Sequence, residues 1–116
     1  MKIAEVIAFV DDIKPNAFSD ETKLRWINEC EAMIQTEVLL ISPHDIVTYK
    51  NTDTEFVLLI DIPYDKIYTA YLCAMVDFSN GEYAKYQNSM ALYNSLMGDL
   101  RRFIAGRFRP ADREEE

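Results

Sequence analysis

Few residues of this chain are of the types that carry out chemistry, and their spacing favours no catalytic or metal site. The single histidine, His44, has no cysteine near it, and Cys30 and Cys73 form none of the CxxC or Cys/His spacings typical of metal ligands. No surrounding motif marks a serine as a nucleophile, and three glycines are too few to build a phosphate-binding loop. We therefore expect a protein that is not an enzyme and that binds no cofactor, metal or small-molecule substrate.

Carboxylates are plentiful, and a buried pair of them could act as general acid and base. Most lie on helix faces where solvation accounts for them, or at helix starts where they complement the helix dipole. Asp77 differs, because Val76 and Phe78 flank it in a crowded apolar stretch. We expect Asp77 to accept a structural hydrogen bond from a tyrosine or an arginine of a neighbouring helix. Cys30 and Cys73 also lie in apolar stretches, which favours buried, reduced thiols.

The net charge of −8, from 12 basic and 20 acidic side chains, argues against sequence-independent binding of nucleic acid. A duplex-binding protein gathers Lys and Arg to neutralise phosphates, and here the excess is acidic. The simplest interpretation of this balance is solubility through mutual repulsion. A sharper hypothesis is a surface that stays close to DNA without holding it.

Tyrosines are concentrated in the second half of the chain. Six of the seven occur at positions 64, 68, 71, 83, 86 and 93. They either fill the core between the last two helices, with their hydroxyls paired, or stand exposed as anchors for a partner. Stacking on single-stranded nucleic acid would need a basic groove beside them, and this sequence has none.

The elements that must hold these side chains are mostly helical. Helical spacing of apolar residues predicts four helices, over residues 3–13, 20–40, 63–79 and 82–105. Pro15 ends the first helix, and Ser19 is placed to cap the second. Pro63 suits the first position of the third helix, and Asn80 with Gly81 marks its end. We therefore predict an all-α fold, a small bundle of about four helices.

The apolar residues of each predicted helix indicate how the helices pack. In the second helix we expect the solvated side to be formed by Glu29, Glu31, Gln35 and Glu37. The third helix is apolar on two sides, so it must be covered on both and is central in the fold or in an oligomer. The fourth carries an uninterrupted heptad seam, formed by Tyr83, Tyr86, Met90, Tyr93, Met97, Leu100 and Ile104.

Residues 45–61 form the one non-helical insertion, with β-branched and aromatic residues on both sides of a polar turn at 51–53. This composition predicts an extended loop or a short hairpin between the second and third helices. A long loop in a small domain is commonly functional. We expect this one to become firmly ordered when it docks on a partner.

We predict a single domain over residues 1–110, followed by a charged tail, residues 111–116, that we expect to be disordered. The first ten residues are too short and too acidic for a signal peptide, and no apolar run reaches the length of a membrane span. The expected location is therefore the cytoplasm, without attachment to a membrane.

The last two predicted helices contain a pattern of aromatic and polar residues that is similar to a known family. Its parts are Pro63-Tyr64-Asp65-Lys66-Ile67-Tyr68, Tyr71-Leu72, Ala74, Asp77, Gly81-Glu82-Tyr83, Tyr86, Asn88-Ser89 and Tyr93-Asn94. This pattern resembles the last two helices of the small head–tail connector proteins of tailed bacteriophages, also called head-completion or adaptor proteins. The upstream part agrees, since a helix carrying Trp26-Ile27 precedes an irregular apolar segment. The resemblance covers most of the chain and is specific from about residue 53 to residue 94.

The resemblance implies a structural protein of a phage or prophage virion, present in the host cytoplasm during assembly and then at the head–tail joint. Copies form a ring, typically twelve-fold, beneath the portal protein. The ring extends the DNA channel, lets DNA pass without tight binding, and docks the next tail-joining protein. The family has no catalytic residue or metal to carry over to this chain.

The family pattern also implies roles for individual positions. Those that match it would be scaffold, namely Tyr64, Asp65, Tyr68, Tyr71, Asp77, Tyr86 and Tyr93. Contacts to portal and tail would come from the loop before the third helix and from the C-terminal segment, with candidates Tyr49, Lys50, Phe56, Arg101, Arg102, Arg107, Phe108 and Arg109.

A function of a different class is also compatible with these residues. The chain could be a small acidic helical binding module or regulator, monomeric or dimeric, whose acidic face binds a basic protein partner. The last two helices carry more apolar surface than one small monomer needs, which favours the assembling protein.

Overall fold

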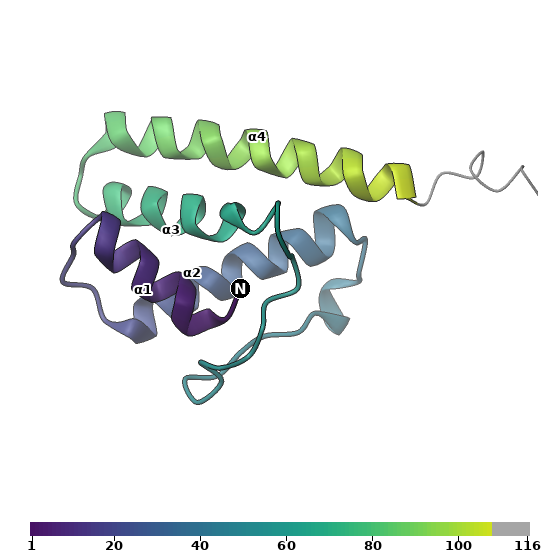
Figure 1. The fold of residues 1–116 in the computed structure, drawn as a ribbon, viewed down its shortest axis with the longest axis horizontal. Helices are drawn as coiled ribbons and strands as arrows, with labels where there is room; N and C mark the ends of the chain where they lie inside the picture. Colours follow the sequence, from purple (N-terminus) through teal and green to yellow (C-terminus); the bar gives the residue numbers. More distant parts are fainter. Residues whose placement is uncertain (108–116) are drawn as a thin grey trace, which may run out of the picture.

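The computed structural model describes residues 1–107 of the chain (Figure 1). This part contains four α-helices: α1 Ile3–Ile13, α2 Asp20–Met33, α3 Lys66–Ser79 and α4 Tyr83–Arg107. A π-helical turn, η1 Ile34–Val38, continues α2, and a short 3-10 turn, η2 Pro43–Asp45, follows it. The predicted all-α fold with about four helices is confirmed.

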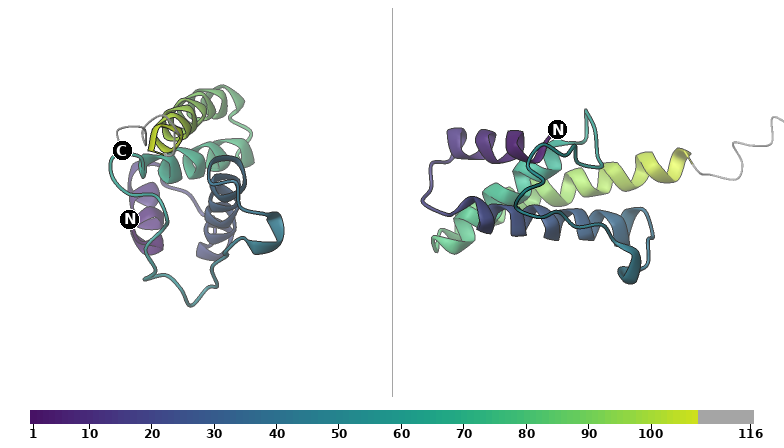
Figure 2. Two further views of the ribbon diagram at one scale, coloured as in Figure 1. Left: turned by 90° about the vertical axis from the view of Figure 1, so that its right-hand side faces the viewer. Right: turned by 90° about the horizontal axis from the view of Figure 1, so that it is seen from below.

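Helix α3 lies in the middle of the structure. In the end-on view of Figure 2, α4 covers one side of α3, and α1 and α2 pack side by side against the other. Nine of the 14 residues of α3 are buried, and Tyr68 and Leu72 are completely enclosed. The prediction that this helix is central in the fold is therefore confirmed.

Several helix ends are where the sequence places them. Helix α1 spans residues 3–13 as predicted, and Ser19 caps α2 by accepting a hydrogen bond from the Thr22 amide at 3.1 Å. Helix α3 ends at Ser79, and Gly81 follows with φ +75°, a backbone angle at which glycine is unstrained.

Two predicted helix boundaries are wrong. The second helix was expected to stay α-helical to residue 40, but it becomes π-helical after Met33. There the Thr36 hydroxyl donates to the Ala32 carbonyl at 2.9 Å, which competes with the regular helix ladder. The third helix does not begin at Pro63, because the Tyr64 amide donates to the Asp61 carbonyl and closes a turn instead.

Residues 46–60, called the 46–60 segment below, cross the open side of α1 and α2 as extended chain. The described residues contain no β-strand, so of the two predicted forms the extended loop is correct and the hairpin is wrong. The segment pairs instead with the start of the chain. Phe56 and Thr54 accept from the Ile3 and Ala4 amides at 3.1 and 2.9 Å, and Leu58 donates to Met1. These bonds satisfy amides that an isolated helix α1 would leave unpaired.

Candidate interaction surfaces

A buried carboxylate on α2 anchors the 46–60 segment. Glu31 has no exposed surface, and its carboxylate accepts hydrogen bonds from the Tyr68 hydroxyl at 2.6 Å and the Tyr49 hydroxyl at 2.9 Å. It also accepts from the Leu59 amide at 3.1 Å, while the Tyr68 hydroxyl in turn accepts from the Ile60 amide. One carboxylate thus ties α2, α3 and both ends of the 46–60 segment together.

The electrostatics of this network keep both tyrosines protonated. Burial, reinforced by the adjacent Glu31 carboxylate, raises the pKa of Tyr68 and the pKa of Tyr49 well above the usual range. Because the phenols stay neutral, they act as hydrogen-bond donors to the carboxylate. The arrangement explains how a charge is accommodated in the core.

Two amide side chains, one on α2 and one on η1, hold the start of the same segment. Gln35 donates to the Val47 carbonyl at 2.9 Å and accepts from the Val47 amide at 2.8 Å. Asn28 does the same with the carbonyl and amide of Tyr49, at 3.0 and 2.8 Å. Each side chain therefore imitates the neighbouring strand that the extended backbone would otherwise need.

Our assignment of Glu31 and Gln35 to the solvated side of the helix is wrong, because both are buried. Asn28, Glu31 and Gln35 recur at intervals of three and four, which places them on one face of the helix. This spacing is the signal in the sequence that could have identified a polar anchoring face. The same spacing is also typical of the solvated face of an amphipathic helix, so the sequence alone does not distinguish the two cases.

Asp77 is buried as its sequence context predicts, but its partners differ from the expected tyrosine or arginine. Its Oδ1 lies 3.0 Å from the Lys14 ammonium, an ion pair rather than a well-aligned hydrogen bond. Ser89 of α4 donates to its Oδ2 at 3.4 Å. Asp77 therefore links the end of α1 to α3 and α4.

The tyrosines serve mainly as core. Tyr68, Tyr71 and Tyr93 are buried, and the Tyr71 hydroxyl donates to Glu29 at 2.9 Å. Tyr64 and Tyr86 are half-buried, and Tyr83, at the first position of the heptad seam, is exposed. Of the seam residues, Tyr93, Met97 and Leu100 are buried, and Met90 and Ile104 are partly buried.

The residues expected to contact partners have varied environments. Tyr49 is buried in the chain itself, whereas Lys50, Phe56, Arg101 and Arg102 are exposed. Arg107 ends α4, and Phe108 and Arg109 lie outside the described residues, as does the tail at 111–116.

The structure adds little to the search for chemistry. Within residues 1–107, no three His, Cys, Asp or Glu side chains are gathered as a metal site requires. Cys30 and Cys73 are free and buried, as predicted, and burial raises the pKa of both thiols. No helix of the described chain has the length and apolar character needed to cross a membrane.

A first uncovered apolar surface, the α1 groove, runs along α3 between α1 and α4. It has a volume of about 350 Å³. Its apolar lining includes Phe9 and Ile13 from α1, Ala70 and Cys73 from α3, and Leu92 from α4. Phe9, Ile13 and Leu92 are each about half exposed, so this face of α3 has no complete cover in the monomer.

A second uncovered surface, the α4-end groove, lies between η1 and the last turns of α4. It has a volume of about 510 Å³ and is lined by Val38, Leu39, Leu40, Ile104 and Ala105, with Glu37 and Arg101 at its rim. Leu40 is 81% exposed. Helices α1 and α2 lie side by side beneath the α3–α4 pair (Figure 2). The α1 groove is lined from α1, whereas the α4-end groove is lined from η1, which continues α2.

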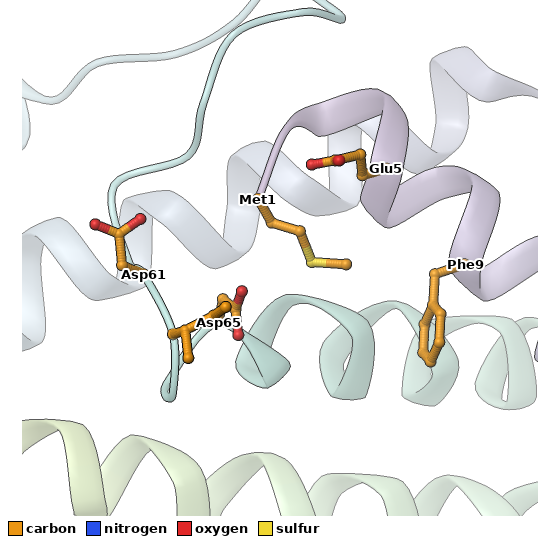
Figure 3. Close-up of a pocket in the computed structure, with 6 residues that line it drawn as sticks. Met1, Glu5, Phe9, Asp61 and Asp65 are labelled. Atoms are coloured by element: carbon orange, nitrogen blue, oxygen red, sulfur yellow. The ribbon is translucent and has the colours of Figure 1, made fainter.

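A third hollow, the acidic groove, lies where α1 approaches the start of α3 (Figure 3). Its volume is about 590 Å³. It is lined by the acidic residues Glu5, Asp61 and Asp65 and by the apolar residues Met1, Phe9 and Ile62. The Met1 side chain lies between the three acidic residues in Figure 3. Phe9 also lines the α1 groove, so this side chain borders both hollows.

The comparisons with known proteins assign none of these surfaces. The chain matches no protein-family model, no curated protein and no solved structure.

Proposed function

We propose that this protein is a structural subunit of a phage or prophage virion, forming a ring at the head–tail joint between the portal and the next tail-joining protein. The ring would continue the DNA channel beneath the portal. In this role the chain would bind copies of itself and its two neighbours, and it would carry out no chemical reaction.

The observation that carries the proposal is the pair of different apolar grooves, one lined from α1 and the other from η1. The α1 groove and the α4-end groove differ in volume and in lining, so a contact of one with the other joins two different surfaces of adjacent copies. Contacts between two different surfaces join copies head to tail, and such contacts give rings when the rotation closes. The exposed Leu92 and Leu40 would be covered in that arrangement.

The sequence supports the same role independently. The tyrosine-rich pattern between residues 53 and 94 resembles the head–tail connector proteins, in which rings are typically twelve-fold. The chain's charge of −8 favours a channel wall that DNA passes without being held. The exposed side of the 46–60 segment, with Val47, Phe56 and Val57, is the proposed docking surface for portal or tail components.

The direct test is assembly on a phage portal, whose gene we expect beside the gene of this chain. Purified portal rings are mixed with the chain and examined by electron microscopy. We expect an added coaxial ring of protein with a central channel. Portal rings that stay bare at high concentrations of folded chain contradict the proposal, and recovery of the chain in a complex with a basic regulatory protein instead favours the binding-module alternative.

A matched pair of variants ties the test to the grooves. Leu92→Asp places a charge in the α1 groove and should abolish the added ring, because burying an unpaired carboxylate is unfavourable. Ala91→Asp, at an exposed neighbouring position that lines neither groove, should leave the ring intact. Circular dichroism should show the same helix content for both variants and the wild type.

A further inference from the structure

Leu40, which follows η1, has a backbone conformation that is unusual for leucine. Its φ is +58°, and it is the one non-glycine residue within residues 1–107 with a positive φ. The Ile41 amide donates to the Gln35 carbonyl at 2.8 Å and closes this left-handed turn. Helices that end in such a turn usually have glycine there, because a side chain at positive φ strains the backbone. Leucine at this position therefore lowers the stability of the chain.

The side chain of Leu40 is also poorly used within its own chain. Its neighbours Val38 and Leu39 pack in the core or against it, whereas Leu40 is 81% exposed. A large apolar side chain in water, on a strained backbone, is unfavourable on both counts. No packing within residues 1–107 accounts for it, and such strain is typical of positions that serve a function.

The α1 groove has the lining to receive a leucine side chain. Its volume is about 350 Å³, and its apolar walls include Phe9 and Ile13 from α1 and Leu92 from α4. Each of these three side chains is about half exposed in the monomer. An inserted leucine would remove its own surface and theirs from water, which is the main source of stability in a contact between proteins.

Charge favours the same pairing. The residues that line the α1 groove include Lys14 and Lys66 and no acidic residue, although the chain has a net charge of −8. Lys14 is already paired within the chain, but Lys66 is exposed and takes part in no ion pair within residues 1–107. Asp45, five residues after Leu40, is likewise exposed and without an ion pair there. The surroundings of Leu40 therefore complement the rim of the groove on a second copy.

We propose that Leu40 of one copy inserts into the α1 groove of the next copy. The inference rests on the proposed function, which brings the α1 groove and the α4-end groove of adjacent copies together, and it names the residue that enters and the groove that receives it. Asp45 of the first copy approaches Lys66 of the second beside the inserted side chain. Because each copy offers one knob and one groove, the contact repeats head to tail.

Leu40→Gly separates assembly from stability, because it removes the side chain and relieves the strain together. Thermal melting should give a melting temperature equal to that of the wild type or above it. The variant should add no ring to phage portal rings, and sedimentation velocity should show self-association weaker than wild type by more than about tenfold. Leu40→Met keeps an apolar side chain of similar size and should associate within about threefold of wild type.

Cross-linking locates the contact. A chain with Leu40→Cys and Leu92→Cys, oxidised with copper phenanthroline, should form a disulfide-linked ladder that extends beyond dimers, since each copy carries a thiol on both sides of the contact. The matched control carries Ile62→Cys and Leu92→Cys. Ile62 is 82% exposed, as Leu40 nearly is, but it lines neither the α1 groove nor the α4-end groove. The control should form no ladder.

Charge variants test the ionic part of the contact at low salt. Lys66→Glu brings like charges together and should weaken self-association several-fold, whereas Lys85→Glu, at an exposed position that lines neither groove, should leave it unchanged. A chain with both Asp45→Lys and Lys66→Glu has the two charges exchanged. It should regain most of the lost association.

The proposal is overturned if Leu40→Gly associates as the wild type does, if it melts well below the wild type, or if the Leu40 and Leu92 cysteines give no ladder. A Lys66→Glu protein that behaves like Lys85→Glu overturns the pairing of Asp45 with Lys66. A portal ring that survives Leu40→Gly keeps the proposed function and places the subunit contact elsewhere. A wild-type chain that associates neither alone nor on the portal removes both the contact and the head–tail role, whereas the ladder without a portal ring removes only the role.

Discussion

The α3–α4 pair and the 46–60 segment are stabilised in different ways. The two helices bury apolar side chains such as Leu72, Met97 and Leu100, and their positions follow from a repeating pattern along each helix. The 46–60 segment lacks such a pattern and is held mainly by hydrogen bonds between its backbone and side chains of α2 and η1. The stability of the helix pair is therefore spread over many apolar contacts. The position of the segment depends on a few polar groups, above all Glu31.

The largest effect is expected for Glu31→Ala. It removes the common acceptor of Tyr49, Tyr68 and the Leu59 amide, and it leaves two buried hydroxyls and one partly buried amide without this partner. We expect the free energy of unfolding to fall on the order of 4 kcal/mol. Chemical denaturation measures this loss. Glu37→Ala, which removes an exposed ion pair with Arg101, should cost less than about 1 kcal/mol, and equal losses for the two variants would contradict the anchoring role.

The second prediction concerns the helix pair. Leu100→Ala should lower the free energy of unfolding by about 3 kcal/mol, because it opens a cavity under α4. Native-state hydrogen exchange should distinguish it from Glu31→Ala. We expect Leu100→Ala to leave the local opening of the Val47, Tyr49 and Leu59 amides unchanged, and Glu31→Ala to speed their exchange. If both variants speed exchange there equally, the two regions unfold as one unit.

The smallest effect appears at high pH. Unfolded Tyr68 loses its proton near pH 10, while in the folded chain burial and Glu31 hold its pKa far higher. The stabilisation is complete below pH 10 and falls as the pH rises above it, by about 1.4 kcal/mol per pH unit for this one residue. Thermal melting between pH 8 and 11 measures the slope. Tyr68→Phe should reduce the slope, whereas Tyr83→Phe, at an exposed position, should leave it unchanged.

The helices could be predicted because their signals are local. The apolar spacing of α1, the Ser19 cap and Gly81 after α3 each act over a few residues, and the structure agrees with all three. The start of α3 was misjudged, since Pro63 suits the first turn of a helix and a tight turn equally well. The hairpin alternative failed for a related reason. Residues 46–60 have strand-like composition, but their backbone partners are side chains of α2 and η1 and the backbone at the start of the chain.

The candidate surfaces were predicted less completely. The sequence indicates surplus apolar surface on the last two helices, but it does not tell which residues remain uncovered after packing. Phe9, Leu40 and Leu92 line the grooves, and none of them was distinguished beforehand from core residues of the same type. Tyr49 shows the converse, since it was expected as a contact and is buried against Glu31.

The sequence by itself determined the helical class, the central position of α3, the acidic balance and the basic end of α4, because composition and helical periodicity express these directly. Only the tertiary structure decided that Glu31 and Gln35 face inward. It also decided which apolar side chains stay uncovered and that Asp61 and Asp65 lie beside Phe9 around one groove. The physical reason is that burial and the choice of hydrogen-bond partners depend on contacts between residues far apart in the chain. A local sequence pattern does not predict these contacts.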